Sequence, residues 1–399
     1  DEPCQVPDRL AYRIGTGTKM GCFAVEFSRD GNYLAAACVG ESDFPVRVYD
    51  AQTGRLAASF SGHRSLVYDI SWGVTNDAIV TASADGRACV WSLGLAARNS
   101  SSGACDGQVS DVNSAAAVPS VENDGYSPEQ GLLVAFHHAP PCYIYCCCFH
   151  PVAVNPGLVV TGAYDCSVRL WSVTASTGYL PSQGGRLNGG RNDHESHVTA
   201  CSFDDAGTRL FTGSGDGVVK VWRLTRDQEP ANPASWQNVR TLIDNVLKGN
   251  CITSIAVNPV EKEMVVQAQK NCLRAFELSA RYPLARKQFG GTHCQSSTVR
   301  SRFSPDGRYV VSGSEAGRAC FWKAATGDRV HSAACGSLGY GKAMCDVAWH
   351  PTEHLVAMCC FGGDYPILLF EAEHSHGGTN YEDKGRHKRG IPGFHNQTR

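Results

Sequence analysis

The chain has 399 residues, more than a usual single domain, and its 36 Lys and Arg nearly balance its 38 Asp and Glu, for a formal net charge of −2. This balance gives no global positive field, so nucleic acid is not an expected partner. No stretch approaches the roughly 18 consecutive apolar residues of a membrane helix, so we expect no integral membrane segment. The first residue is Asp1 rather than Met, which predicts a fragment or a processed chain.

One repeat runs along the chain. An aromatic or apolar residue that ends an apolar run is followed by Pro, Asp or Gly in seven copies, beginning at Phe27, Trp72, Phe149, Phe203, Val257, Phe303 and Trp349. The successive spacings are 45, 77, 54, 54, 46 and 46 residues. The longest spacing contains a Ser-, Ala- and Asn-rich stretch at 97–131, which we interpret as a flexible insertion.

Each unit is predicted to form four short strands. The stretch "RLFTGSGDGVVKVW", Arg209 to Trp222, shows two strands joined by a Gly and Asp bend, which is typical of a hairpin. Seven such units predict an all-β, seven-bladed WD40 β-propeller over residues 1–375, followed by an extension at 376–399. "RLAYRI", Arg9 to Ile14, is expected to add the outer strand of the last blade and so close the ring.

A set of polar residues recurs at fixed offsets in three units. A Thr lies ten residues before a Trp and an Asp six before it, and two units add a His 22 residues before the Asp. The set comprises His63, Thr81, Asp85 and Trp91; Thr161, Asp165 and Trp171; and His194, Thr212, Asp216 and Trp222. These side chains can form a hydrogen-bond network within a blade. A hydrolase triad would occur once, so the recurrence favours structure over catalysis and predicts that the chain is not an enzyme.

The fifth and sixth units depart from the pattern. The sixth has Ala316 in place of the Asp, and the fifth, "VQAQKNCLRAFE", lacks the Trp. We expect these blades to depend on packing alone.

Two features that could indicate a cofactor or a metal are explained otherwise. "GSLGYGKA", Gly336 to Ala343, has Ala343 in place of the hydroxyl of a phosphate-binding loop, and it leads into a predicted strand rather than a helix. The 19 cysteines are odd in number and lie within apolar runs such as "IYCCCF", as reduced core thiols would. No paired metal-ligand spacing occurs, so we expect neither a cofactor nor a metal.

The sequence resembles the jouberin family, WD40 proteins of the ciliary transition zone and basal body. The resemblance runs nearly end to end and is carried by "GCFAVEFSRDGNYLAAAC", "GHRSLVYDISW", "YIYCCCFHPVAVNPGLVVTGAYDCSVRLW", "DVAWHPTEHLVAMCCFGGDYPILLFE" and "GIPGFH". It implies a non-enzymatic scaffold in the assembly of cilia or flagella. The implied partners are other ciliary or cytoskeletal proteins within a larger complex. The implied location is the cytoplasm and cytoskeleton at the base of the cilium.

Residues four and six before the repeat markers are expected on one face of the propeller. Aromatic residues gather there in the first three units, and with two neighbouring side chains they form a candidate protein-binding patch: Phe23, Arg64, Leu66, Tyr68, Tyr143, Tyr145 and Tyr164. Tyr and Arg are favoured in binding hot spots. The alternative is that these rings only cap the blades.

Two rival functions stay open. The basic stretch "KGRHKRG", Lys384 to Gly390, would suit the acidic surface of tubulin and so a structural role along axonemal microtubules, although a solvated tail is the simpler interpretation. A general WD40 adaptor, such as a substrate receptor of a ubiquitin ligase, is the other rival.

Overall fold

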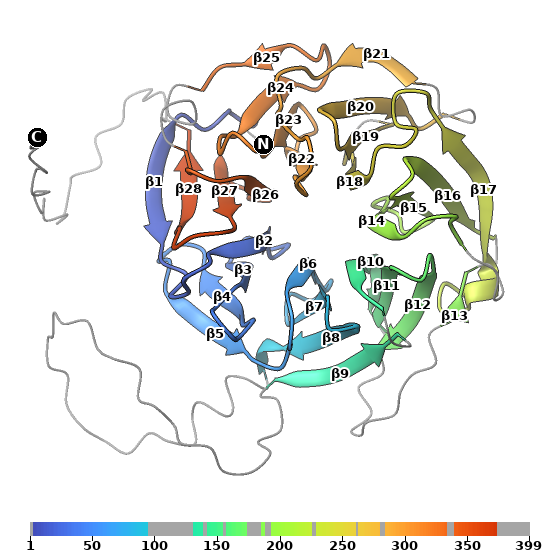
Figure 1. Cartoon of the computed structure of the whole chain (residues 1–399), viewed down its shortest axis with the longest axis horizontal. Coiled ribbons are helices and arrows are strands. Elements are labelled where there is room, and N and C mark those ends of the chain that lie inside the picture. The colour runs from blue at the N-terminus through green and yellow to red at the C-terminus, as the bar shows by residue number, and fades with distance from the viewer. Residues whose placement is uncertain are drawn as a thin grey trace, which may run out of the picture.

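The computed structural model describes residues 3–94, 131–138, 142–154, 157–173, 185–187, 193–225, 229–260, 262–279, 284–332 and 339–372. Within them, seven four-stranded antiparallel sheets stand in a circle around a central opening (Figure 1). The predicted all-β, seven-bladed propeller is therefore confirmed. The predicted extension at 376–399 and all of the predicted insertion except Gly131 lie outside the described residues.

Each blade runs from an inner strand at the opening to an outer strand at the rim. The first four blades are β2 (Cys22–Phe27), β3 (Tyr33–Cys38), β4 (Val46–Asp50) and β5 (Leu56–Phe60); β6 (Val67–Trp72), β7 (Ala78–Ser83), β8 (Arg87–Ser92) and β9 (Leu132–His137); β10 (Ile144–Val154), β11 (Gly157–Ala163), β12 (Val168–Val173) and β13 (Gly185–Arg186); and β14 (Val198–Phe203), β15 (Arg209–Ser214), β16 (Val218–Leu224) and β17 (Trp236–Ile243).

The remaining blades follow the same order. They are β18 (Ile252–Val257), β19 (Glu263–Ala268), β20 (Cys272–Glu277) and β21 (Leu284–Gln288); β22 (Ser301–Phe303), β23 (Tyr309–Ser312), β24 (Cys320–Lys323) and β25 (Arg329–Val330); and β26 (Met344–Trp349), β27 (Leu355–Cys360), β28 (Ile367–Glu371) and β1 (Arg9–Ile14). A short 3₁₀ helix, η2 (Pro233–Ser235), precedes β17. In the described residues, no helix is long and apolar enough to cross a bilayer.

The hydrophobic core lies between neighbouring blades. One apolar cluster, for example, joins Leu34 and Ala36 of the first blade to Ala357 and Leu369 of the seventh. Second strands are covered on both faces by the adjacent blades, so β27 is buried along its whole length. Double-sided burial explains why the sequence of such strands, "LVAMCC" in this case, is apolar throughout instead of alternating.

The ring closes as the sequence predicts, because the first strand of the chain completes the last blade. β1 pairs antiparallel with β28, from Arg9 opposite Glu371 to Ile14 opposite Ile367, and the two lie side by side in Figure 1. Ile14 is buried in the cluster between the seventh and first blades. The Arg9–Glu371 ion pair of 2.5 Å is largely exposed, so it adds little to stability.

The residue directly after the repeat marker joins each of three blades to the next. The hydrogen bonds run from His150 Nε2 to Gly207 O (2.9 Å), from Asn258 Nδ2 to Gly307 O (3.1 Å) and from His350 Nε2 to Gly31 O (2.9 Å). The three glycines have positive φ, and a Cβ on any of them would lie 2.2–2.3 Å from the side chain that it binds. Only glycine therefore fits these turns.

We expect Ile14→Asp to lower the free energy of unfolding by at least about 3 kcal/mol, because it removes buried apolar contacts and buries a carboxylate. Arg13→Asp is the matched control: Arg13 is exposed on the same strand, so its change should stay within about 0.5 kcal/mol. Urea unfolding of the two variants measures both values. Equal losses in the free energy of unfolding for the two variants would show that burial of Ile14 does not stabilise the pairing of β1.

Candidate functional site

The second blade holds the complete predicted network. His63 Nδ1 lies 2.9 Å from Asp85 Oδ2, His63 Nε2 lies 2.7 Å from Thr81 Oγ1, and the Trp91 indole donates to Thr81 Oγ1 at 2.9 Å. Burial alone would raise the pKa of Asp85, but hydrogen bonding and charge from His63 outweigh it and hold the pKa well below its usual value. The four side chains join the loop before β6 to the middle of the blade.

The third blade contains a second network with a histidine that the sequence search missed. Trp171 donates to Thr161 Oγ1 at 2.8 Å, as expected, and His138 Nε2 lies 3.1 Å from the same oxygen. His138 Nδ1 is 3.8 Å from Asp165 Oδ1. His138 precedes Asp165 by 27 residues instead of 22, because the surrounding loops are longer, so a search at fixed spacing could not find it.

The predicted Asp–His pair of the fourth blade is wrong. Trp222 and His194 both contact Thr212 Oγ1, at 2.9 and 2.7 Å, as expected. The Asp216 carboxylate, however, accepts from the Ser214 hydroxyl at 2.5 Å, and buried His194 Nδ1 has no hydrogen-bond partner among the described residues. Burial, with Lys220 nearby, lowers the pKa of His194 to about 3, so its ring stays neutral.

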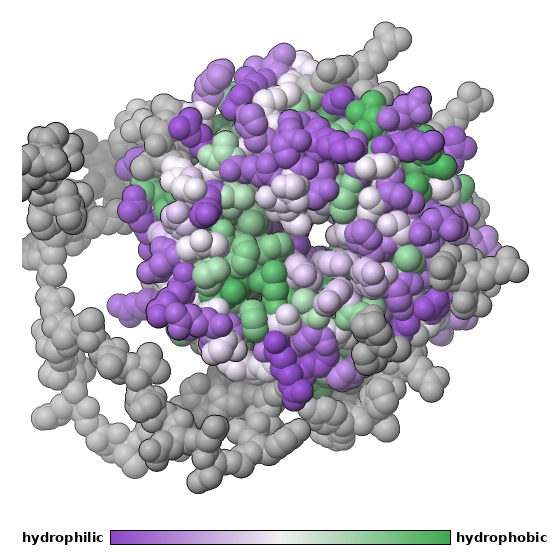
Figure 2. Space-filling view, viewed as in Figure 1, coloured by the Kyte–Doolittle hydropathy of each residue, from purple (hydrophilic) through white to green (hydrophobic). Residues whose placement is uncertain are grey.

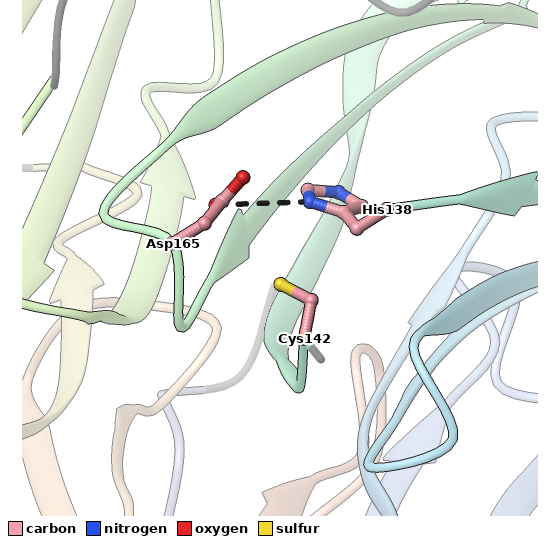
Figure 3. Close-up of side chains that lie close together, drawn as sticks. All are labelled: His138, Cys142 and Asp165. Carbon is pink, nitrogen blue, oxygen red and sulfur yellow. Dashed lines mark ion pairs between the residues drawn. The ribbon is translucent and has the colours of Figure 1, made fainter. Parts of the chain in front are cut away.

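His138, Cys142 and Asp165 converge closely enough to raise the question of a metal (Figure 3). Two guanidinium groups, of Arg169 and Arg186, already contact Asp165 Oδ2 at 3.0 and 3.1 Å. Burial raises the pKa of the Cys142 thiol, which disfavours the thiolate that a metal requires. The donor set thus fits the hydrogen-bond network of the third blade better than a metal centre.

A run of seven aromatic rings crosses one face of the propeller beside the central opening. We call this set the aromatic arc: Phe361, Phe23, Tyr68, Tyr145, Tyr143, Tyr164 and His197. Ring centroids are 5.8 Å apart for Phe361 and Phe23, 5.6 Å for Phe23 and Tyr68, and 5.3 Å for Tyr68 and Tyr145. The arc spans the seventh, first, second, third and fourth blades. Figure 2 shows apolar surface beside the opening, over β2.

All five aromatic residues of the predicted patch lie in the arc, whereas its two other members do not. Arg64 is exposed, and its backbone N–H donates to Asp85 at 3.0 Å, so it belongs beside the network. Leu66 is half-buried next to β6. Phe361 and His197 are additions, and Phe361 comes from a turn after β27 whose direction the repeat does not fix.

A pocket of about 240 Å³ opens against the middle of the arc. Its lining comprises Phe23, Tyr68, Tyr145, His197, Thr199, Cys251, Ile252, Thr253, Thr298 and Arg300. This volume is below the roughly 300–1,000 Å³ of sites for drug-sized ligands. The pocket therefore suits a single side chain of a partner better than a cofactor.

Arg300 joins three blades at this pocket. Its guanidinium pairs with Asp346 at 2.9 Å and Asp69 at 3.3 Å, and it donates to the Tyr68 carbonyl. Arg300 comes from the sixth blade, whereas its partners come from the seventh and second. Although burial opposes the charge, the two carboxylates raise the pKa of Arg300 further above its usual value.

Glu26, on the inner strand β2, lies near the same charges. Its Oε2 atom is buried without a hydrogen-bond partner. Burial raises the pKa of Glu26 to about 8, opposed by Arg302 and reinforced by Asp69 and Asp346. The carboxyl group is therefore mostly protonated at neutral pH, and its titration is expected to affect stability.

The weaker fifth and sixth units also form blades. In the sixth, the Trp322 indole donates to the Gly290 carbonyl at 3.0 Å, in place of the threonine used elsewhere. The glycine-rich stretch before the seventh blade leads into strand β26 and not into a helix, as expected for a chance match to a phosphate loop. The 17 described cysteines are free thiols, most of them buried.

Four segments, at 54–92, 131–172, 187–223 and 287–323, match the WD40 family, described as WD domain, G-beta repeat. The chain is thus a seven-bladed β-propeller that contains segments similar to WD40 repeats. Among solved structures, the beta-propeller domain of Cps50 (Swd1) from Myceliophteria thermophila covers 92% of this chain and all of its own, with a TM-score of 0.64 and 17% sequence identity. At that identity the match supports the fold alone.

Curated relatives include jouberin from Rattus norvegicus, 28% identical over 376 residues, which covers 92% of this chain. Jouberin from Mus musculus is likewise 28% identical, over 374 residues. The chain spans 31% of the length of either relative. The denticleless protein homolog from Gallus gallus is 20% identical over 402 residues, covering 92% of this chain and 49% of that protein.

Thr81→Val should lower the free energy of unfolding by about 1–3 kcal/mol, because it leaves the buried Trp91 indole and His63 without their shared oxygen. Thr75→Val is the control, since its hydroxyl is exposed and contacts only Asp77, and should change the value by less than about 0.5 kcal/mol. Thermal and urea unfolding measure the difference. A cost at Thr81 no larger than at Thr75 would contradict a stabilising role of the network.

The raised pKa of Glu26 predicts that the free energy of unfolding depends on pH. Because its pKa is about 8 in the folded chain and ordinarily 4.5, the folded state binds more protons between these values, so the free energy of unfolding falls as pH rises through this window. Glu26→Gln should remove that part of the fall and make the chain more stable than wild type near pH 8. Urea titrations at pH 5, 6.5 and 8 measure the slope, and an unchanged slope in the variant would contradict the assignment to Glu26.

Proposed function

We propose that the chain is a non-enzymatic scaffold that binds a partner protein through the aromatic arc. One observation carries the proposal: seven rings in successive contact lie beside a pocket of single-side-chain size. Tyrosines supply large contact area at low cost in conformational entropy, which is why they are enriched in binding hot spots.

The exposure of the rings favours binding over simple capping of the blades. Phe23 is only 8% exposed, as a capping ring would be, but Tyr143 and Tyr164 are 46% and 52% exposed. A ring that served only to cover a blade would bury most of its surface. The outer end of the arc is therefore available to a partner.

The similarity to jouberin supports a place for this scaffold in the cilium or flagellum. It extends over 92% of the chain, well beyond the segments that match the repeat. We infer a jouberin-like role in organising the transition zone and basal body, within a complex of ciliary or cytoskeletal proteins. Binding along axonemal microtubules is the variant of this role in which the partner is tubulin.

A general adaptor is the second candidate. The similarity to the denticleless protein homolog also extends over 92% of the chain, although at 20% identity. Such an adaptor would use the same arc for a partner outside the cilium, such as a ubiquitin-ligase substrate. The two candidates differ in cellular location, not in the binding surface.

Tagged full-length protein in detergent-extracted ciliated cells tests both parts of the proposal. We expect a discrete signal at the base of the cilium, and we expect Tyr68→Ala with Tyr145→Ala to reduce its retention several-fold, because the double variant removes the centre of the arc. Leu56→Ala is the control, since Leu56 is 53% exposed on an outer strand far from the arc in the ring.

The outcomes separate the candidates. Labelling along the shaft would favour the microtubule-bound role, and diffuse signal lost on extraction would leave the general adaptor. Retention of the double variant at the wild-type level, with unchanged thermal unfolding, would contradict binding through the arc.

A further inference from the structure

The outer end of the aromatic arc forms a closed group of four rings. Centroid distances are 6.3 Å for Tyr143 and Tyr145, 5.5 Å for Tyr145 and His197, 6.3 Å for His197 and Tyr164, and 5.8 Å for Tyr164 and Tyr143. We call these four residues the ring cage. The centre of a quadrilateral with such sides lies within the roughly 6 Å reach of a cation–π contact from every ring.

Two rings of the cage, those of His197 and Tyr145, are held in their neutral forms. Burial lowers the pKa of His197, with Asp216 opposing, so its imidazole carries no charge at neutral pH. Burial, with the neighbouring tyrosines, raises the pKa of Tyr145 to about 12, so its phenol also stays uncharged. Neutral aromatic faces carry partial negative charge, which attracts a cation and not an anion.

Carboxylates lie beside the cage. Cys166, two residues after Tyr164, has a pKa raised by burial and by the charges of Asp165, Asp216 and Glu195. Asp165 is balanced by Arg169 and Arg186. Within the described part of the chain no ion pair engages Asp216 or Glu195, so both can attract an incoming positive charge.

We propose that the ring cage binds the ammonium group of a lysine side chain, free or methylated, on the partner protein. The inference rests on the proposed function and adds the chemistry of the partner. A compact ammonium at this centre lies within cation–π distance of all four ring centroids, whereas a planar guanidinium stacks best on one or two rings. The two exposed tyrosines leave the cage open to solvent, as a partner side chain requires.

A larger pocket of about 880 Å³ at the other end of the inner strands is a weaker candidate. It has carboxylates of Asp306, Glu353 and Glu371 in its lining, but no aromatic ring apart from His354. Asp306 already accepts from the backbone of Cys4 at 2.8 Å, and Glu371 pairs with Arg9. Two of its three carboxylates therefore already stabilise the seventh blade and the segment before β1.

Choline and its neutral isostere 3,3-dimethyl-1-butanol are matched probes of the cage. We expect the choline N-methyl proton signal to shift upfield when the chain is added, and choline to bind roughly 3- to 30-fold more tightly than the isostere. Tyr164→Ala should abolish the shift, Tyr164→Phe should keep it, and Leu56→Ala should leave it unchanged. A second titration compares Nα-acetyl-lysine amide, its trimethylated form and Nα-acetyl-arginine amide.

Each of these titrations can contradict the inference that the ring cage binds a lysine ammonium group. Equal affinity for choline and the isostere would overturn cation binding and indicate an apolar pocket, and tighter binding of the arginine amide would overturn the assignment to lysine. Absent binding by a folded chain whose retention in cells still depends on Tyr68 and Tyr145 would reject the cage but keep the proposed function. Choline binding together with unaffected retention would reject the proposed function alone.

Discussion

Pairing of β1 with β28 is the constraint on which the rest of the molecule depends. The core lies between blades, so every junction must be filled for any sheet to have both faces covered. A blade at the end of an open row would expose one apolar face and one unpaired edge. By supplying the outer strand of the last blade, β1 holds the seventh blade against the first. It thereby leaves neither an exposed apolar face nor an unpaired edge.

The aromatic arc is built across this same junction. Phe361 belongs to the seventh blade and Phe23 to the first, and an isolated bridge between Gly21 and Phe361 joins the two segments. Arg300 adds a second connection, from the sixth blade to the second and seventh. The spacing of the rings is thus fixed by the closure of the ring, and the surface is organised before any partner arrives.

The sequence predicted most of the fold because its repeat has a nearly constant period and each copy begins with the same buried strand. The hydrogen-bond networks were predictable only where loop lengths matched. His138 was missed because longer loops displace it by five positions, and the Asp216 pair failed because Ser214, two residues away, takes the carboxylate. A spacing rule cannot register such local competition between donors.

The aromatic arc was likewise predictable only in part. Phe23, Tyr68 and Tyr145 are each the second residue of an inner strand, so they share a direction and could be placed on one face from their positions in the repeat. Phe361 lies in a turn after a second strand, where only the folded backbone sets its direction. Closure of four rings into a cage depends on distances between blades, which no single repeat contains.

Joining both ends of the ring in one blade has a mechanical consequence. The chain enters β1 at Arg9 and leaves β28 at Glu371, and these two residues are partners at the same end of an antiparallel ladder. Tension on the flanking segments would first load the contacts of Cys4, Gln5 and Asp8 and then open the ladder one hydrogen bond at a time, instead of shearing all its bonds together. A pulling force applied through both flanking segments would thus open the propeller at the β1–β28 pairing, which is the contact that closes the ring.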